Sequence, residues 1–142
     1  SFAYLTQYPE QFRTAIIANP VVNYHFSVTC SDIPEWAIAE SLMKEYGELS
    51  LEDFKKTIEL SPSCKEDKKK IKSKIQLVLG SKDKRVPPAQ ALEFFRNLKK
   101  EGVNIECNIY PDEGHSLANS LESLFDYVLR CLLFLELNLK AQ

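Results

Sequence analysis

The most restrictive feature of this sequence is an alternation of strand-like and helix-like segments in its second half. Residues 75–80 form a short apolar run that ends in a Gly-Ser turn, which is typical of a buried strand. A helix begins at Pro87-Pro88 and ends near Gly102, and residues 103–110 form a second strand. Another helix follows from about Leu117. Strand, helix, strand, helix with short turns predicts parallel strands joined by right-handed crossovers.

The first half of the chain adds one more strand and several helices. Residues 13–18 are an apolar run closed by Asn-Pro, as expected of a buried strand that enters a loop. Residues 1–8 resemble the end of a helix. The stretch from the Asn-Pro pair to Pro34 is expected to be irregular, and a second helix is expected from Pro34 until Gly47 stops it. The segment Ser50-Leu51-Glu52-Asp53 resembles a capping box and starts a third helix that runs to about Glu59. The prediction is an α/β fold with about three parallel strands and flanking helices.

The final helix is expected to bury one apolar side. Its leucine, phenylalanine and valine residues recur at helical spacing and predict a face turned toward the sheet, made of Leu121, Leu124, Phe125, Val128, Leu129, Leu132 and Leu133.

Charge and composition exclude several classes of function. The chain has 142 residues and a net charge of -2, whereas a nucleic-acid-binding domain is normally clearly basic. Its longest apolar stretch, residues 131–135, is far shorter than the roughly 20 residues that cross a bilayer, so no membrane partner is expected. The 4 cysteines contain no C-x-x-C pair and accompany only 2 histidines, so we expect no metal and no cofactor. Free thiols favour a reducing compartment, the cytoplasm.

Two polar residues follow consecutive strands. Asp83 comes just after the strand ending at Gly80, and His115 comes just after the strand ending at Tyr110. Functional residues of open parallel sheets gather beyond the carboxyl ends of the strands, and this order of acid and histidine matches the second half of a Ser…Asp…His triad. From topology alone, an ordinary turn aspartate and a histidine in a surface loop remain the alternative.

Motifs along almost the whole chain resemble the C-terminal part of the acylaminoacyl-peptidases, α/β-hydrolases of the prolyl oligopeptidase family. These motifs are Gln7-Tyr8-Pro9-Glu10, Asn19-Pro20-Val21-Val22-Asn23, Ser31-Asp32-Ile33-Pro34-Glu35-Trp36, Gly80-Ser81-Lys82-Asp83-Lys84-Arg85-Val86-Pro87, Tyr110-Pro111 and Gly114-His115-Ser116.

The resemblance implies that Asp83 is the triad acid and His115 the general base of a serine peptidase that releases N-acyl amino acids from blocked peptides. Arg85 resembles the arginine that binds a substrate carbonyl or carboxylate, the alternative being a surface arginine paired with an acid. Trp36 resembles an aromatic of the S1 pocket, with a core tryptophan as the alternative.

The sequence departs from the family at the nucleophile. No G-x-S-x-G elbow occurs, and the resemblance implies that the serine lies about six residues before Ser1. We therefore expect residues 1–142 to be a partial catalytic domain, truncated at its N-terminal side and inactive alone. Its expected partners are an N-acylated peptide and the missing N-terminal part of the same protein, with the oligomeric state left open. The alternative functions are an esterase or lipase of the same fold, and a non-catalytic pseudo-enzyme or interaction module.

Overall fold

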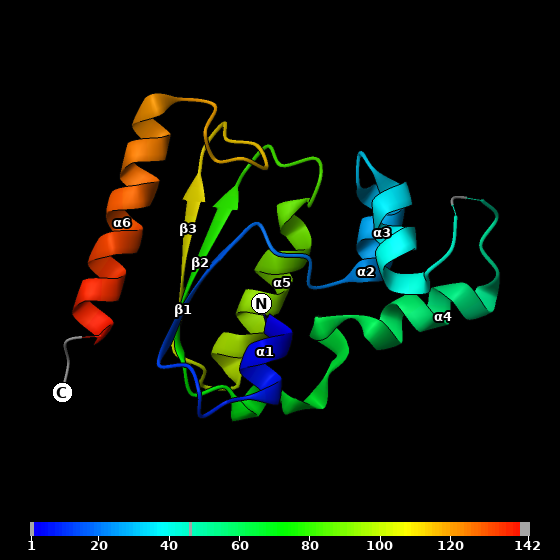
Figure 1. Cartoon of the computed structure of the whole chain (residues 1–142), viewed down its shortest axis with the longest axis horizontal. Coiled ribbons are helices and arrows are strands. Elements are labelled where there is room, and N and C mark those ends of the chain that lie inside the picture. The colour runs from blue at the N-terminus through cyan, green and yellow to red at the C-terminus, as the bar shows by residue number, and fades with distance from the viewer. Residues whose placement is uncertain (1, 46, 140–142) are drawn as a thin grey trace.

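A three-stranded parallel sheet lies between two helical layers in the computed structural model, which describes residues 2–45 and 47–139. The strands are β1 (Thr14–Ala18), β2 (Lys74–Gly80) and β3 (Ile105–Tyr110), and β2 is central. Helices α1 (Phe2–Gln7) and α5 (Pro88–Lys100) cover one face of the sheet, and α6 (Leu121–Leu139) lies on the other (Figure 1). The predicted fold class and all three predicted strands are confirmed, each boundary within two residues.

The central strand is buried on both faces. Six of the seven residues of β2 are buried, as expected of a strand with neighbours on both edges and a layer on each face. Alternate β2 side chains therefore point into the core beneath α5, where Phe2 meets the ring of Phe94 edge-on at a centroid distance of 4.9 Å. This core consists of Phe2, Leu5, Ile17, Val22, Ile71, Ile75, Leu77, Leu79, Ala91, Phe94, Leu98, Val103 and Ile105.

A second helical group extends from the carboxyl end of β1 to one side of the sheet (Figure 1). It contains α2 (Tyr24–Cys30), α3 (Pro34–Leu42) and α4 (Leu51–Leu60). The predicted capping box at the start of α4 is confirmed, since the Ser50 hydroxyl accepts from the Asp53 N–H and the Asp53 carboxylate accepts from the Ser50 N–H. Hydrogen bonds from Lys44 and Ser50 lower the pKa of Asp53 from 3.8 to about 2.

Two predictions for this helical group are wrong. The helix that starts at Pro34 ends at Leu42, because Met43 adopts a left-handed φ of 55° and donates its N–H to the Ala39 carbonyl, so Gly47 plays no part in its termination. The segment that forms α2 was predicted to be irregular, and it is a helix. It is only seven residues long, and the Asn23 side chain caps it by accepting from the Phe26 N–H.

The prediction for α6 is also wrong, both in its start and in its buried side. The helix begins at Leu121 and not at Leu117. Six of the seven side chains expected against the sheet are exposed, among them Phe125 at 71% and Leu129 at 56%, and Phe134 alone is buried within the helix. No described helix is long and apolar enough to cross a membrane.

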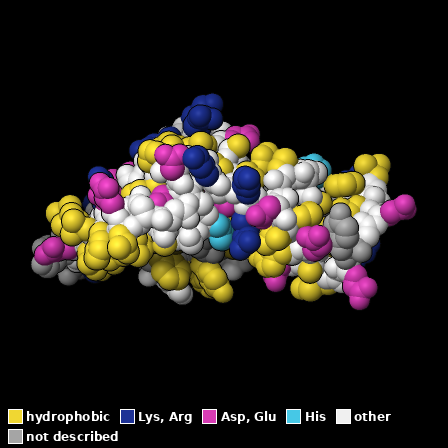
Figure 2. All heavy atoms as spheres, turned by 90° about the horizontal axis from the view of Figure 1, so that it is seen from above, with side chains coloured by type: hydrophobic (Ala, Val, Ile, Leu, Met, Phe, Trp, Pro, Cys, Tyr) yellow, Lys and Arg dark blue, Asp and Glu magenta, His cyan; other side chains and the backbone are white. Residues whose placement is uncertain are grey.

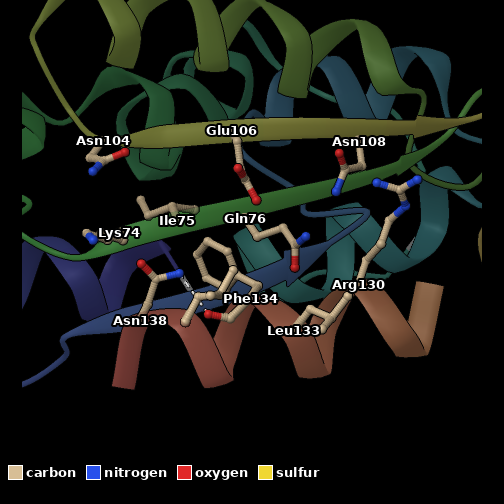
Figure 3. Close-up of a pocket in the computed structure, with 11 residues that line it drawn as sticks. Lys74, Ile75, Gln76, Asn104, Glu106, Asn108, Arg130, Leu133, Phe134 and Asn138 are labelled. Carbon is tan, nitrogen blue, oxygen red and sulfur yellow. Dashed lines mark hydrogen bonds between the residues drawn. The ribbon is translucent and has the colours of Figure 1, made fainter. Parts of the chain in front are cut away.

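The sheet face beneath the second half of α6 explains part of this difference, because it is polar, whereas Val78 and Tyr110 make the face apolar near Tyr127. Figure 3 shows Gln76 and Glu106 extending from β2 and β3 toward α6, and Arg130 reaching from α6 toward Asn108. A cavity of about 420 Å³ separates the two layers, and the buried Gln76 Oε1 has no hydrogen-bond partner among the described residues. A polar sheet face cannot draw a full apolar stripe of the helix against it.

Candidate active site

The two polar residues that follow neighbouring strands meet at the carboxyl edge of the sheet. β2 and β3 are parallel and pair Gly80 with Tyr110, so the loops that follow them start side by side. The Nδ1 atom of His115 lies 2.8 Å from Oδ2 of Asp83. A carboxylate only accepts hydrogen bonds, so Nδ1 carries the proton of a neutral ring and Nε2 keeps its lone pair for another partner.

Asp83 is held by its own loop as well as by the histidine. It is 3% exposed, and its second oxygen, Oδ1, accepts the backbone N–H groups of Arg85 and Val86, each at 2.9 Å. The carboxylate is thereby fixed in rotation, with Oδ2 aimed at His115. This orientation is what a group that fixes the tautomer of an imidazole requires.

Asn19 also fixes the loop between β3 and α6 that carries His115 (residues 111–120, the histidine loop). No role was predicted for Asn19. It ends β1 with a left-handed φ of 41°, a conformation that asparagine tolerates better than most residues. Its Oδ1 accepts the Gly80 N–H at 2.9 Å, while its Nδ2 donates to the His115 carbonyl at 2.8 Å. A single buried side chain therefore joins the ends of two strands to the loop that carries the histidine. The Asn-Pro pair after an apolar run predicts a loop at this position but not these long-range contacts.

Gly80 allows the histidine loop to lie directly on the end of β2. A Cβ at this position would be 2.4 Å from the Gly114 carbonyl oxygen and 2.6 Å from that of Glu113. The Glu113 carbonyl also accepts the Lys82 N–H at 2.8 Å, so the two loops are bonded to each other.

The buried carboxylate of Glu113 fixes the end of the histidine loop that leads into α6. It accepts the backbone N–H groups of Asn119 at 2.7 Å and Ser120 at 3.1 Å, just before α6 begins. The bond from the Asn119 N–H, followed by those from Ser123 and Ser120, lowers the pKa of Glu113 below its ordinary value of 4.5.

Arg85 and Trp36 line a hollow beside the histidine. Trp36, on α3, is 43% exposed and so is not part of the hydrophobic core. The hollow has a volume of about 460 Å³, and Val21, Ile33 and Val86 make it mostly apolar. Both Arg85 and His115 lie on its rim. Arg85 is half-exposed, with Nε 3.6 Å from an Asp32 oxygen, which is a weak pairing that leaves the guanidinium available.

The remaining candidate groups carry no comparable arrangement. The cavity beneath α6 shares no lining residue with the hollow at His115. The four cysteines are free, and burial raises the pKa of the Cys107 and Cys131 thiols, which disfavours reactive thiolates. Among the side chains that the structure describes, no three from His, Cys, Asp or Glu gather as metal ligands. His25 packs edge-on against Phe54 at 5.4 Å, as a structural histidine does.

An Asp–His pair of this geometry can act as a general base if a nucleophile is placed beside it. His115 Nε2 can take a proton from a hydroxyl placed against it, and Asp83 then stabilises the resulting imidazolium. The 142 residues contain no G-x-S-x-G motif to supply that hydroxyl.

Comparisons with known proteins place the chain in a family. It is 32% identical over 134 residues to the rat acylamino-acid-releasing enzyme, covering 94% of this chain and 18% of that protein. The human acylamino-acid-releasing enzyme is 33% identical over 113 residues, 79% of this chain and 15% of the relative. The chain thus spans less than a fifth of the length of these relatives.

Solved structures give the same result. The acylaminoacyl peptidase of Pyrococcus horikoshii matches with a TM-score of 0.78 and 26% identity, over 98% of this chain and 22% of that one. An acylaminoacyl peptidase in complex with Z-Gly-Gly-Phe-chloromethyl ketone matches with a TM-score of 0.76 and 25% identity, over 95% of this chain and 21% of that one. The sequence profile described as "Prolyl oligopeptidase family" matches residues 1–142. The chain belongs to the prolyl oligopeptidase family.

Proposed function

We propose that this chain supplies the acid–base half of the catalytic centre of a serine peptidase that hydrolyses N-acylated peptides and releases the N-acyl amino acid. The observation that carries the proposal is the 2.8 Å contact between His115 Nδ1 and an Asp83 carboxylate that two backbone amides hold in place. The names of the relatives support the substrate class. In this proposal residues 1–142 are part of a catalytic domain whose N-terminal side provides the serine.

The catalytic steps assigned to this chain concern one proton. His115 Nε2 takes it from the serine hydroxyl as the oxygen attacks the scissile carbonyl, and later returns it to the departing amine. Asp83 keeps Nδ1 protonated and stabilises the imidazolium in between. The fragment alone should not hydrolyse acyl-amino-acid anilides, nor should a fluorophosphonate probe label it, because both need an activated serine.

Two residues of the apolar hollow recognise the substrate in this proposal. Trp36 contacts the side chain of the residue to be released. Arg85 donates hydrogen bonds from its planar guanidinium to a substrate carbonyl, a task that the point charge of a lysine performs poorly. The free thiols support a location in the cytoplasm.

The test compares two substrates in the full-length protein that contains this chain. A charge-assisted hydrogen bond is worth about 1.5–3 kcal/mol, so Arg85→Ala should lower kcat/KM for an acetylated peptide about 10- to 150-fold. p-Nitrophenyl acetate is too small to reach Arg85 and should be hydrolysed at a nearly unchanged rate. Arg85→Lys should restore little of the peptidase activity.

Arg96→Ala is the matched control, because Arg96 is an exposed arginine on the outer side of α5. It should leave both activities unchanged. Equal losses on ester and peptide in Arg85→Ala would reduce the proposal to a general hydrolase. If the wild-type full-length protein cleaves the ester and not the acetylated peptide, the peptidase assignment is wrong.

A further inference from the structure

A second hollow lies against His115 on the other side of Arg85. It has a volume of about 360 Å³, and its lining includes Lys82, Lys84 and Ser116 as well as Arg85 and His115. The apolar hollow that contains Trp36 also has Arg85 and His115 on its rim. A substrate whose scissile bond lies at His115 therefore has one flanking group in an apolar hollow and the other in this polar one.

The charges around the second hollow are mostly positive. Three cations, Lys82, Lys84 and Arg85, line it together with two carboxylates, Asp32 and Asp83. Asp83 is buried and already bonded to His115, so its charge is shielded from a ligand. Viewed onto the carboxyl ends of the strands, Figure 2 shows lysine and arginine side chains gathered beside a histidine.

Lys84 is the cation with no counter-ion. Lys82 pairs with Asp112 at 2.5 Å and Arg85 approaches Asp32 at 3.6 Å, whereas Lys84 makes no hydrogen bond or ion pair through its side chain with any residue that the structure describes. Lys84 is exposed and lines the hollow. An unpaired cation next to a weakly paired one, Arg85, attracts a carboxylate.

The backbone holds Lys84 in place relative to the histidine. Its carbonyl accepts the Asp32 N–H at 3.0 Å, and the neighbouring Arg85 carbonyl accepts the Ser31 hydroxyl at 2.7 Å. Asp83, the preceding residue, is fixed by His115 and by two backbone amides. The backbone of Lys84 is therefore fixed relative to His115, and its long side chain lines the hollow.

We propose that the second hollow is a subsite for a substrate carboxylate, with Lys84 as its specificity-determining residue. This inference rests on the proposed function and adds a substrate class to it: acylated peptides that carry a carboxylate next to the scissile bond. The carboxylate can come from an acidic side chain directly after that bond, or from a dicarboxylic acyl group such as succinyl on the residue before it.

The experiment uses the full-length protein and two isosteric substrate pairs, one for each source. The first pair is acetyl-Ala-Asp-amide and acetyl-Ala-Asn-amide; the second is succinyl-Ala-p-nitroanilide and its neutral succinamoyl counterpart. An exposed ion pair predicts that kcat/KM is about 2- to 5-fold higher for the charged member of the pair whose carboxylate reaches the hollow. The preference should disappear at 1 M salt, where the screening length falls to about 3 Å.

Variants then assign the preference to Lys84. Lys84→Gln should bring the charged-to-neutral ratio close to one, and Lys84→Glu should invert it. Lys100→Gln makes the same change in charge at the other end of α5, about 18 Å along the helix from Pro88, and should keep the wild-type ratio. No charge preference in either pair, or a preference that survives Lys84→Gln, would overturn the subsite. Hydrolysis of the neutral members by the wild-type protein tests the proposed function separately, because it does not involve the carboxylate.

Discussion

Replacing Gly80 by alanine tests whether the position of the histidine loop controls catalysis. The new Cβ would lie 2.4 Å from the Gly114 carbonyl oxygen, and ordinary van der Waals contact begins near 3.4 Å. Both obstructing atoms are backbone, so the loop must move by about 1 Å to accept the methyl group. Gly80 does not have a positive φ, so alanine adds no backbone strain.

The cost follows from the neighbouring His115. A misplacement of about 1 Å in a catalytic group can lower the rate about 100-fold, equivalent to about 2.7 kcal/mol in the activation free energy. Overpacking should also lower the free energy of unfolding by about 1–3 kcal/mol. We therefore expect kcat/KM of the full-length Gly80→Ala protein on an acetylated peptide to fall about 100-fold, with a reduced but cooperative thermal transition.

Gly114→Ala is the matched control, because the nearest atom to its added Cβ is the Asn119 Nδ2 at 3.6 Å. The same chemical change in the histidine loop itself should therefore cost at most a few-fold in kcat/KM. Wild-type kcat/KM in a folded Gly80→Ala protein would refute the reasoning, since the loop would then tolerate displacement without loss. A large loss in Gly114→Ala would show that the loop responds to any added methyl group and not to the steric contact.

Three further predictions follow from the same site and its surroundings. Asp83→Asn should lower kcat by roughly 10⁴-fold, the scale seen when the same carboxylate is replaced in a serine protease, and His115→Ala should remove most activity; near-full kcat in Asp83→Asn would exclude Asp83 as the acid. Asn19→Asp replaces the donor to the His115 carbonyl by an acceptor, so kcat should fall at least 10-fold, about the worth of one hydrogen bond. Asn19→Ser should lose less activity. Equal activity of the two variants would contradict the role of Asn19 in fixing the histidine loop. The folded-state pKa values of Asp53 and Glu113 are lowered, so both carboxylates stabilise the fold at neutral pH, and this contribution disappears as the pH falls from about 4.5 toward 2. Thermal unfolding measured across that range should show the loss of stability. Asp53→Asn should make the stability depend less on pH.

The sequence predicted those parts of the fold in which the local pattern of apolar and polar residues matches the packing that surrounds them. The β2 run is apolar at nearly every position and is buried on both faces, so its identity as a central strand could be read directly. The capping box of α4 is equally local, since Ser50 and Asp53 satisfy each other across three residues. The contact between Asp83 and His115 was predictable because parallel strands bring their carboxyl ends together.

Features that depend on the opposing surface could not be predicted in this way. The apolar stripe of α6 indicated a buried side, but burial depends on what the sheet offers, and Gln76, Glu106 and Asn108 make that face polar. Asn19 was missed because its contacts reach residues about 60 and 96 positions away, which no local pattern reveals. The left-handed Met43 that ends α3 breaks the usual preference for glycine and leaves no sequence signal.

The bond between Asn19 and the His115 carbonyl has a consequence for local unfolding. A loop in an α/β protein is usually the first part to open, and its amides exchange with solvent hydrogen far sooner than those of the strands. Here the Gly80 amide is held by the Asn19 side chain, the Ser81 amide by the Tyr110 carbonyl and the Lys82 amide by the Glu113 carbonyl. Opening the histidine loop therefore means releasing the ends of all three strands at once. The amides of Gly80, Ser81 and Lys82 should therefore exchange as slowly as those inside β2, and the loop that carries His115 should open only together with the end of the sheet.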